Sequence, residues 1–84
     1  MFAVKLVTKS GVIKLYNNPS CVYFDPNHKS YYGDQGLLEI YDGGNGSSNT
    51  FIHQNDTQTP LDVIYANIEK AFEENRMVTI CLDS

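Results

Sequence analysis

Residues 59–82, TPLDVIYANIEKAFEENRMVTICL, decide the fold class because they combine two different periodicities. Apolar side chains first recur at steps of three and four residues, which places them on one face of an α-helix. The residues of this stripe are Leu61, Ile64, Tyr65, Ile68, Ala71 and Phe72. From Met77 onward the pattern alternates, with Val78, Ile80 and Leu82 on one face, as in a β-strand. The stretch therefore predicts a helix followed by a strand.

Both ends of the expected helix carry local signals. Thr59 is a favourable N-cap, with Pro60 at the first helical position and Asp62 placed as in an acidic variant of the capping box. Asn75 tolerates the left-handed backbone that ends many helices, and Arg76 lies where a cation interacts favourably with the helix dipole. We therefore expect the helix to begin after Thr59 and to end before Asn75.

Upstream of the helix, the chain alternates like a series of short strands separated by turn residues. Residues 2–7 and 12–16 flank the turn Lys9-Ser10-Gly11, which predicts a hairpin in which Gly11 takes a positive φ. Asn17-Asn18-Pro19 ends the second strand, and Asp25-Pro26-Asn27 is expected to end the third. The later strands are expected at residues 21–24, 37–41 and 50–54.

These elements predict a single α+β domain over residues 1–84, in the order βββββαβ. An antiparallel sheet of about five or six strands would pack against the one C-terminal helix, whose apolar stripe must be buried. The last strand carries Met77, Thr79 and Cys81 on the face opposite its core residues. One helix covers only one side of a sheet, so the pattern also favours a homodimer in which a second copy covers the other.

Composition and charge exclude several classes of protein. The 84 residues carry ten acidic and six basic side chains, a net charge of −4, which argues against direct nucleic-acid binding. No apolar run approaches the roughly 18 residues of a membrane span, and the alternating N-terminus does not resemble a secretory signal. Hydrolase, kinase and zincin signatures are absent, so we expect no enzyme, no catalytic residues and no cofactor.

The two cysteines, Cys21 and Cys81, lie among apolar residues in expected strands. We expect buried, structural thiols in a reducing compartment, the cytoplasm (the host cytoplasm if a phage encodes the chain). A nucleophilic role would need a nearby base, and the only histidines, His28 and His53, stand in no recognisable catalytic motif.

A second class of function rests on the histidines. Asp25-x-x-His28 and His53-x-x-Asp56 place two carboxylates and two imidazoles on two loops, donors that suit zinc, nickel or iron if the loops converge. The spacing is generic, so we expect no metal site. These four residues, which we call the His/Asp frame, and the glycine-rich residues 43–48 support an alternative function, a small-ligand or metal-binding domain that acts as an oligomer. A phosphate loop is disfavoured because a strand follows those glycines and no lysine is near.

Charge and tyrosine content point instead to a protein partner. Residues 1–30 hold four lysines against one aspartate, +3, whereas residues 31–84 hold two basic side chains against nine acids, −7. Such an acidic surface attracts a basic partner, and exposed tyrosine beside Gly, Asn and Ser is favoured at recognition surfaces. The candidate partner-binding residues fall into two patches. The first comprises Tyr31, Tyr32, Asp34, Asp42 and the tip at residues 43–49 with Asn45, and the second comprises Glu69, Glu73 and Glu74.

In general make-up, a small acidic α+β domain rich in Asn and Tyr, the chain resembles small accessory proteins of bacteriophages. That class includes inhibitors of bacterial defence systems, among them anti-CRISPR proteins, which occupy a basic surface of a larger target. The resemblance covers overall character, with no motif matched residue by residue. It implies a non-enzymatic protein-binding module that docks on a larger, basic macromolecule, with an inhibitory role.

Overall fold

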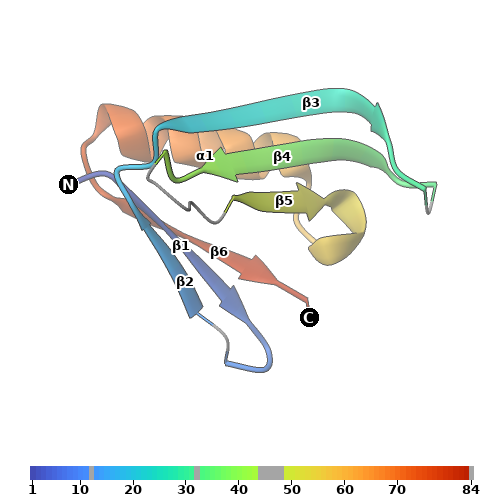
Figure 1. Ribbon diagram of the computed structural model, residues 1–84, viewed down its shortest axis with the longest axis horizontal. Helices are drawn as coiled ribbons and strands as arrows, with labels where there is room; N and C mark the ends of the chain where they lie inside the picture. The colour runs from blue at the N-terminus through green and yellow to red at the C-terminus, as the bar shows by residue number, and fades with distance from the viewer. Residues whose placement is uncertain (12, 32, 44–48, 84) are drawn as a thin grey trace.

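The computed structural model describes residues 1–11, 13–31, 33–43 and 49–83 (Figure 1). Its strands are β1 (Ala3–Thr8), β2 (Ile13–Asn17), β3 (Cys21–Lys29), β4 (Gln35–Tyr41), β5 (Thr50–His53) and β6 (Met77–Leu82). A 3-10 turn, η1 (Gln54–Asp56), and the helix α1 (Leu61–Glu73) lie between β5 and β6. The α+β class and the predicted order of five strands, a helix and a final strand are confirmed.

The strands form two three-stranded sheets where the sequence predicted one larger sheet. The first sheet has the order β2-β1-β6, with β1 antiparallel to β2 and parallel to β6. The second has the order β3-β4-β5 and is antiparallel throughout. A parallel pair requires a long crossover connection, and here everything from β2 to α1 lies between β1 and β6. Figure 1 shows the two sheets splayed apart, with α1 running behind the second sheet.

The hydrophobic core lies where α1 meets both sheets. The buried residues of α1 are Leu61, Ile64, Ile68 and Ala71, at the predicted helical spacing. They contact inward-facing residues of both sheets, among them Val4, Leu6, Leu38, Ile40, Ile52 and Ile80. The Tyr16 and Thr50 hydroxyls also hydrogen-bond to each other and so join β2 of the first sheet to β5 of the second. The helix and this bond both connect the two sheets, as do the hydrogen bonds from the Thr57 hydroxyl to the Cys81 carbonyl and from the Asp83 N–H to the Asp56 carbonyl.

The start of α1 differs from the sequence prediction. Pro60, in extended backbone (φ −55°, ψ 136°), occupies the N-cap position, and Thr59 lies outside the helix. Gln54 of η1 supplies the cap: its Oε1 accepts a hydrogen bond from the Leu61 N–H at 3.0 Å, and its Nε2 donates to the Thr59 carbonyl at 2.9 Å. Local capping patterns do not include a side chain this far upstream, so the sequence gives no sign of it.

Strand β3 is longer than predicted because Asp25-Pro26-Asn27 does not end it. The pairing of β3 with β4 shifts register between Asp25 and Lys29, so this part of the ladder is irregular. Proline is tolerated there because β3 is an edge strand, where a missing N–H costs little. The Asn27 N–H donates to the Asp25 carboxylate at 3.0 Å. The extension carries His28 to the far end of the sheet.

Strand β6 alternates as predicted. Val78, Ile80 and Leu82 pack on the core, whereas Met77, Thr79 and Cys81 are exposed on the opposite face. Whether a second copy covers that face stays a prediction. Within the described residues, no helix has both the length and the apolar character to cross a membrane.

Candidate protein-binding surface

A groove of about 410 Å³ lies between α1 and the start of β3. We call it the α1–β3 groove. Its lining residues are Phe2, Pro19, Ser20, Cys21, Val22, Tyr65, Ile68, Glu69, Phe72 and Glu73. The five residues from α1 follow one another at steps of three, one, three and one, so they form a continuous stripe along one side of the helix. The groove therefore combines an apolar floor with two carboxylates.

Of the aromatic side chains that line this groove, Phe72 is unusually exposed. Phe72 is 65% exposed, although it belongs to the apolar stripe that the sequence pattern predicts for the helix. Its ring meets the Phe2 ring edge to face, with centroids 5.4 Å apart and an interplanar angle of 84°. Phe2 is only 6% exposed, so it fills the space beneath and leaves Phe72 at the surface. An exposed aromatic ring over a buried one presents a firm apolar contact surface.

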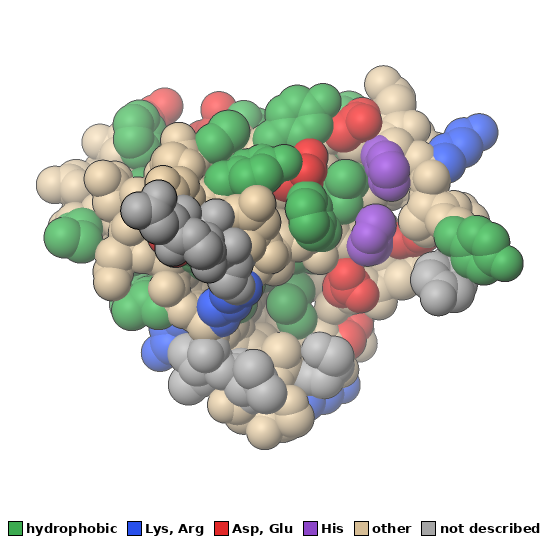
Figure 2. Space-filling view, in the orientation of Figure 1, with side chains coloured by type: hydrophobic (Ala, Val, Ile, Leu, Met, Phe, Trp, Pro, Cys, Tyr) green, Lys and Arg blue, Asp and Glu red, His purple; other side chains and the backbone are tan. Residues whose placement is uncertain are grey.

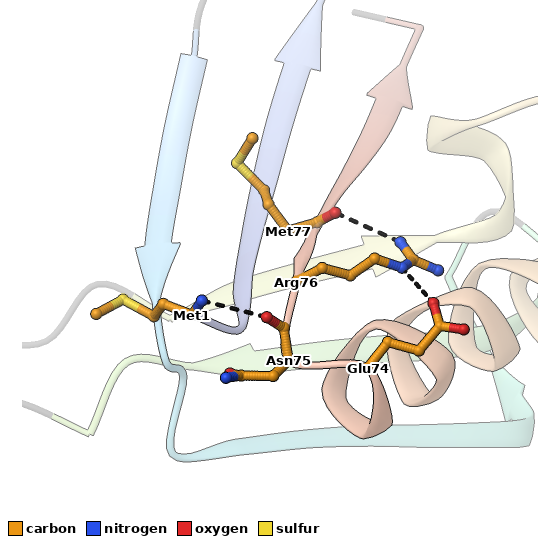
Figure 3. A network of polar contacts seen from close by, with 5 residues as sticks. All are labelled: Met1, Glu74, Asn75, Arg76 and Met77. Atoms are coloured by element: carbon orange, nitrogen blue, oxygen red, sulfur yellow. Dashed lines mark hydrogen bonds and ion pairs between the residues drawn. The ribbon is translucent and has the colours of Figure 1, made fainter.

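The three glutamates predicted as a patch divide into two kinds. Glu69 and Glu73, one helical turn apart, are exposed at the groove, and neither forms an ion pair with another described residue. Glu74 instead accepts a hydrogen bond from the Arg76 Nε at 2.5 Å (Figure 3). That guanidinium hydrogen bond lowers the pKa of Glu74 and offsets its charge. Only Glu69 and Glu73 therefore present uncompensated charge at the groove.

A small polar network holds the groove floor in place (Figure 3). Asn75 adopts the predicted left-handed backbone, with φ 53°. Its Oδ1 accepts a hydrogen bond from the Phe2 N–H at 3.1 Å, and its carbonyl accepts one from the Met1 amine at 3.2 Å. The turn that ends α1 thus ties down the N-terminus and keeps Phe2 under Phe72.

The other predicted binding residues do not join this surface. Tyr31 is 96% exposed at the turn between β3 and β4, at the opposite end of the molecule from the start of β3 (Figure 1). Asp42 is exposed after β4. Tyr32 and Asn45 lie outside the described residues. The sequence offered these loop residues and the helical glutamates as two separate candidate patches, and the α1–β3 groove contains only Glu69 and Glu73 of them. Binding through the loop residues stays a prediction.

Asp34 has a structural role. Its carboxylate accepts hydrogen bonds from the Ser30 hydroxyl and, at 2.9 Å, from the Asn55 N–H. These donors, the Ser30 hydroxyl first, lower the pKa of Asp34. Asp34 thus joins the turn between β3 and β4 to η1.

The predicted His/Asp frame converges only in part. The rings of His28 and His53 lie 5.9 Å apart between centroids, and Figure 2 shows the two histidines side by side. Asp25 accepts a hydrogen bond from Asn27 within its own strand, and Asp56 accepts one from the His53 N–H at 2.9 Å. In the described part of the chain, no three His, Cys, Asp or Glu side chains come together as a metal-binding group.

Both cysteines are free, as expected, but the prediction that they are buried is wrong. Cys21 and Cys81 are exposed. Cys21 begins β3 on its outward side, together with the half-exposed Tyr23. Cys81 lies on the outward face of β6. The residues beside them in sequence are apolar, but each sheet is covered by α1 on one face only.

The comparisons with known proteins add no family or fold assignment. The chain matches no protein-family model, no curated protein and no solved structure.

Proposed function

We propose that this chain is a non-enzymatic protein-binding module that docks on a basic surface of a larger macromolecule through the α1–β3 groove. One observation supports the proposal above all: the exposed Phe72 ring lies beside the unpaired carboxylates of Glu69 and Glu73 over an apolar hollow. Protein interfaces typically centre on an aromatic anchor within a polar rim.

The two parts of this surface have different tasks. Phe72 supplies apolar area, which contributes about 25 cal/mol for each Å² removed from water. Glu69 and Glu73 select a partner by charge, since they repel acidic surfaces and attract lysine or arginine. The net charge of −4 acts in the same direction at longer range. Association should therefore be fastest at low ionic strength.

The specific form that we propose is inhibition by occupancy. A small acidic domain that covers a basic patch prevents another acidic ligand, such as a nucleic acid, from using it. This is the mode of action implied by the resemblance to small bacteriophage accessory proteins. It requires no catalytic residue in this chain.

The test is capture of a partner from a lysate of the native host at low salt, with variants of the groove compared in parallel. Glu69→Lys/Glu73→Lys should abolish capture, and Phe72→Ser should weaken it strongly. Matched controls carry the same changes elsewhere: Asp62→Lys/Asp83→Lys has the same net charge at two exposed positions outside the groove, and Phe51→Ser removes another half-exposed ring.

The controls should retain the partner, and circular dichroism should show that every variant is folded. Equal loss in groove and control variants would show that only bulk charge or surface hydrophobicity matters. Capture that no groove variant affects would refute the groove as the docking site.

A further inference from the structure

The two histidines of the chain form a contact that the secondary structure alone would not create. His28 lies on β3 and His53 ends β5, and β4 separates these strands. The rings nevertheless lie 5.9 Å apart between centroids, at 40° to each other, and both are partly buried. The extension of β3 beyond Pro26, with its register shift, brings His28 to this position.

The separation of the rings suits two ligands of one metal ion. A Zn–N bond of about 2.1 Å places a ring centroid about 3.2 Å from the ion, so two rings on a tetrahedral ion lie about 5.2 Å apart. The observed 5.9 Å is wider by only about 0.7 Å, within reach of small side-chain rotations. Borderline divalent ions such as Ni²⁺, Cu²⁺ and Zn²⁺ prefer imidazole ligands, whereas Mg²⁺ and Ca²⁺ prefer oxygen.

One ring nitrogen of this pair is unsatisfied. His53 Nδ1 is buried and forms no hydrogen bond within the described part of the chain, although the His53 side chain lies in capping-box position toward the Asp56 N–H. Most buried polar atoms in proteins are paired, and an orphaned one calls for an explanation. The unprotonated nitrogen of a neutral imidazole carries the lone pair that binds a metal ion.

The surrounding charges favour a cation. Asp56 accepts the His53 N–H at 2.9 Å, and Asp34 accepts the Asn55 N–H at 2.9 Å, so both carboxylates are fixed to the segment that follows β5. Neither completes a three-ligand group with the histidines. Their negative charge raises the local concentration of cations without adding protein ligands.

We infer that His28 and His53 form a two-imidazole site for a borderline divalent transition-metal ion, with water as the remaining ligands. The site is separate from the α1–β3 groove and does not depend on the proposed docking function. It involves coordination only, with no change of oxidation state.

The test is titration of the full chain with Ni²⁺, followed by calorimetry and by the imidazole C–H signals in proton NMR spectra. The titration uses a Cys21→Ser/Cys81→Ser background, because the two exposed thiols also bind such ions. One equivalent should broaden the signals of both histidines together. His28→Phe or His53→Phe should each weaken binding about 100-fold, because the second ligand no longer acts at high effective concentration. Mg²⁺ should have no effect.

The phenylalanine variants keep an aromatic ring in place, so loss of the fold is not confused with loss of a ligand. If either single variant binds Ni²⁺ as tightly as the parent, or if the parent shows no binding at millimolar Ni²⁺, the pair is a packing contact only and the inference is wrong. With both cysteines kept, because Cys21 lines the α1–β3 groove, partner capture by His28→Phe/His53→Phe should match that of the unchanged chain. This result separates the metal test from the test of the proposed function.

Discussion

Replacing Gln54 by alanine should destabilise the whole domain, because its side-chain amide caps the N-terminus of α1. Its Oε1 accepts the Leu61 N–H at 3.0 Å, and its Nε2 donates to the Thr59 carbonyl at 2.9 Å. Alanine removes both of these bonds and a longer third one, from Nε2 to the Thr57 carbonyl at 3.4 Å, and leaves the first helical N–H unpaired in a partly buried position. The residue that local sequence rules favour as the cap, Thr59, precedes a proline that holds the N-cap position itself.

The size of the effect follows from these contacts. Loss of a helix cap costs about 0.5–2 kcal/mol. The bond to the Thr59 carbonyl adds about 0.5–1 kcal/mol, at the lower end for a bond near solvent. We expect Gln54→Ala to lower the free energy of unfolding by about 1.5 kcal/mol. In a domain of this size that corresponds to a fall in Tm of about 6–12 °C.

Thermal denaturation followed by circular dichroism measures the change, with urea denaturation as a second estimate of the free energy. Thr59→Ala is the matched control, since it deletes the side chain of the locally predicted cap and leaves Gln54 intact. It should shift Tm by no more than about 2 °C, as most surface substitutions do. If Thr59→Ala proves as costly as Gln54→Ala, the assignment of the cap to Gln54 is refuted.

Two further predictions concern the loops. Gly43 has φ +79°, and a Cβ there would lie 2.5 Å from the Ser20 Cβ, whereas at Gly33 (φ +88°) a Cβ would meet nothing within 4 Å. Gly33→Ala should lower the free energy of unfolding, measured by urea denaturation, by about 1–2 kcal/mol, from backbone strain alone. Gly43→Ala should lower it by about 1–3 kcal/mol more, because the new Cβ also meets Ser20. Equal losses in the two variants would contradict the contact with Ser20. Asp34 has a pKa below its ordinary value of 3.8, so its stabilising effect is present above that value and is lost as the pH falls through the lower folded value. The difference in Tm between the parent and Asp34→Asn should be constant near neutral pH and should shrink in acid, and a difference that persists unchanged to pH 2 would argue against this role.

Part of the candidate site was accessible from the sequence. Glu69 and Glu73 were predicted as binding residues from the polar side of an amphipathic helix, a pattern that is local. Phe72 was assigned to the apolar stripe, and its exposure could not be foreseen because Phe2, at the other end of the chain, fills the space beneath it. One feature of the sequence is consistent with this exposure: Phe72 is followed directly by Glu73, so it lies at the boundary between the apolar and polar faces of the helix.

Local patterns by themselves determined the class of this protein and the order of its elements. The helical stripe from Leu61 to Ala71, the left-handed stop at Asn75 and the alternation of β6 depend on residues only a few positions apart, so they are visible in one dimension. The tertiary structure alone decided which strands pair, which faces are covered and which side chains meet. Strand pairing and burial depend on the free energy of the whole packed arrangement, in which α1 covers one face of each sheet. For that reason Gln54 caps a helix it does not adjoin, both cysteines face outward, and His28 meets His53 across an intervening strand.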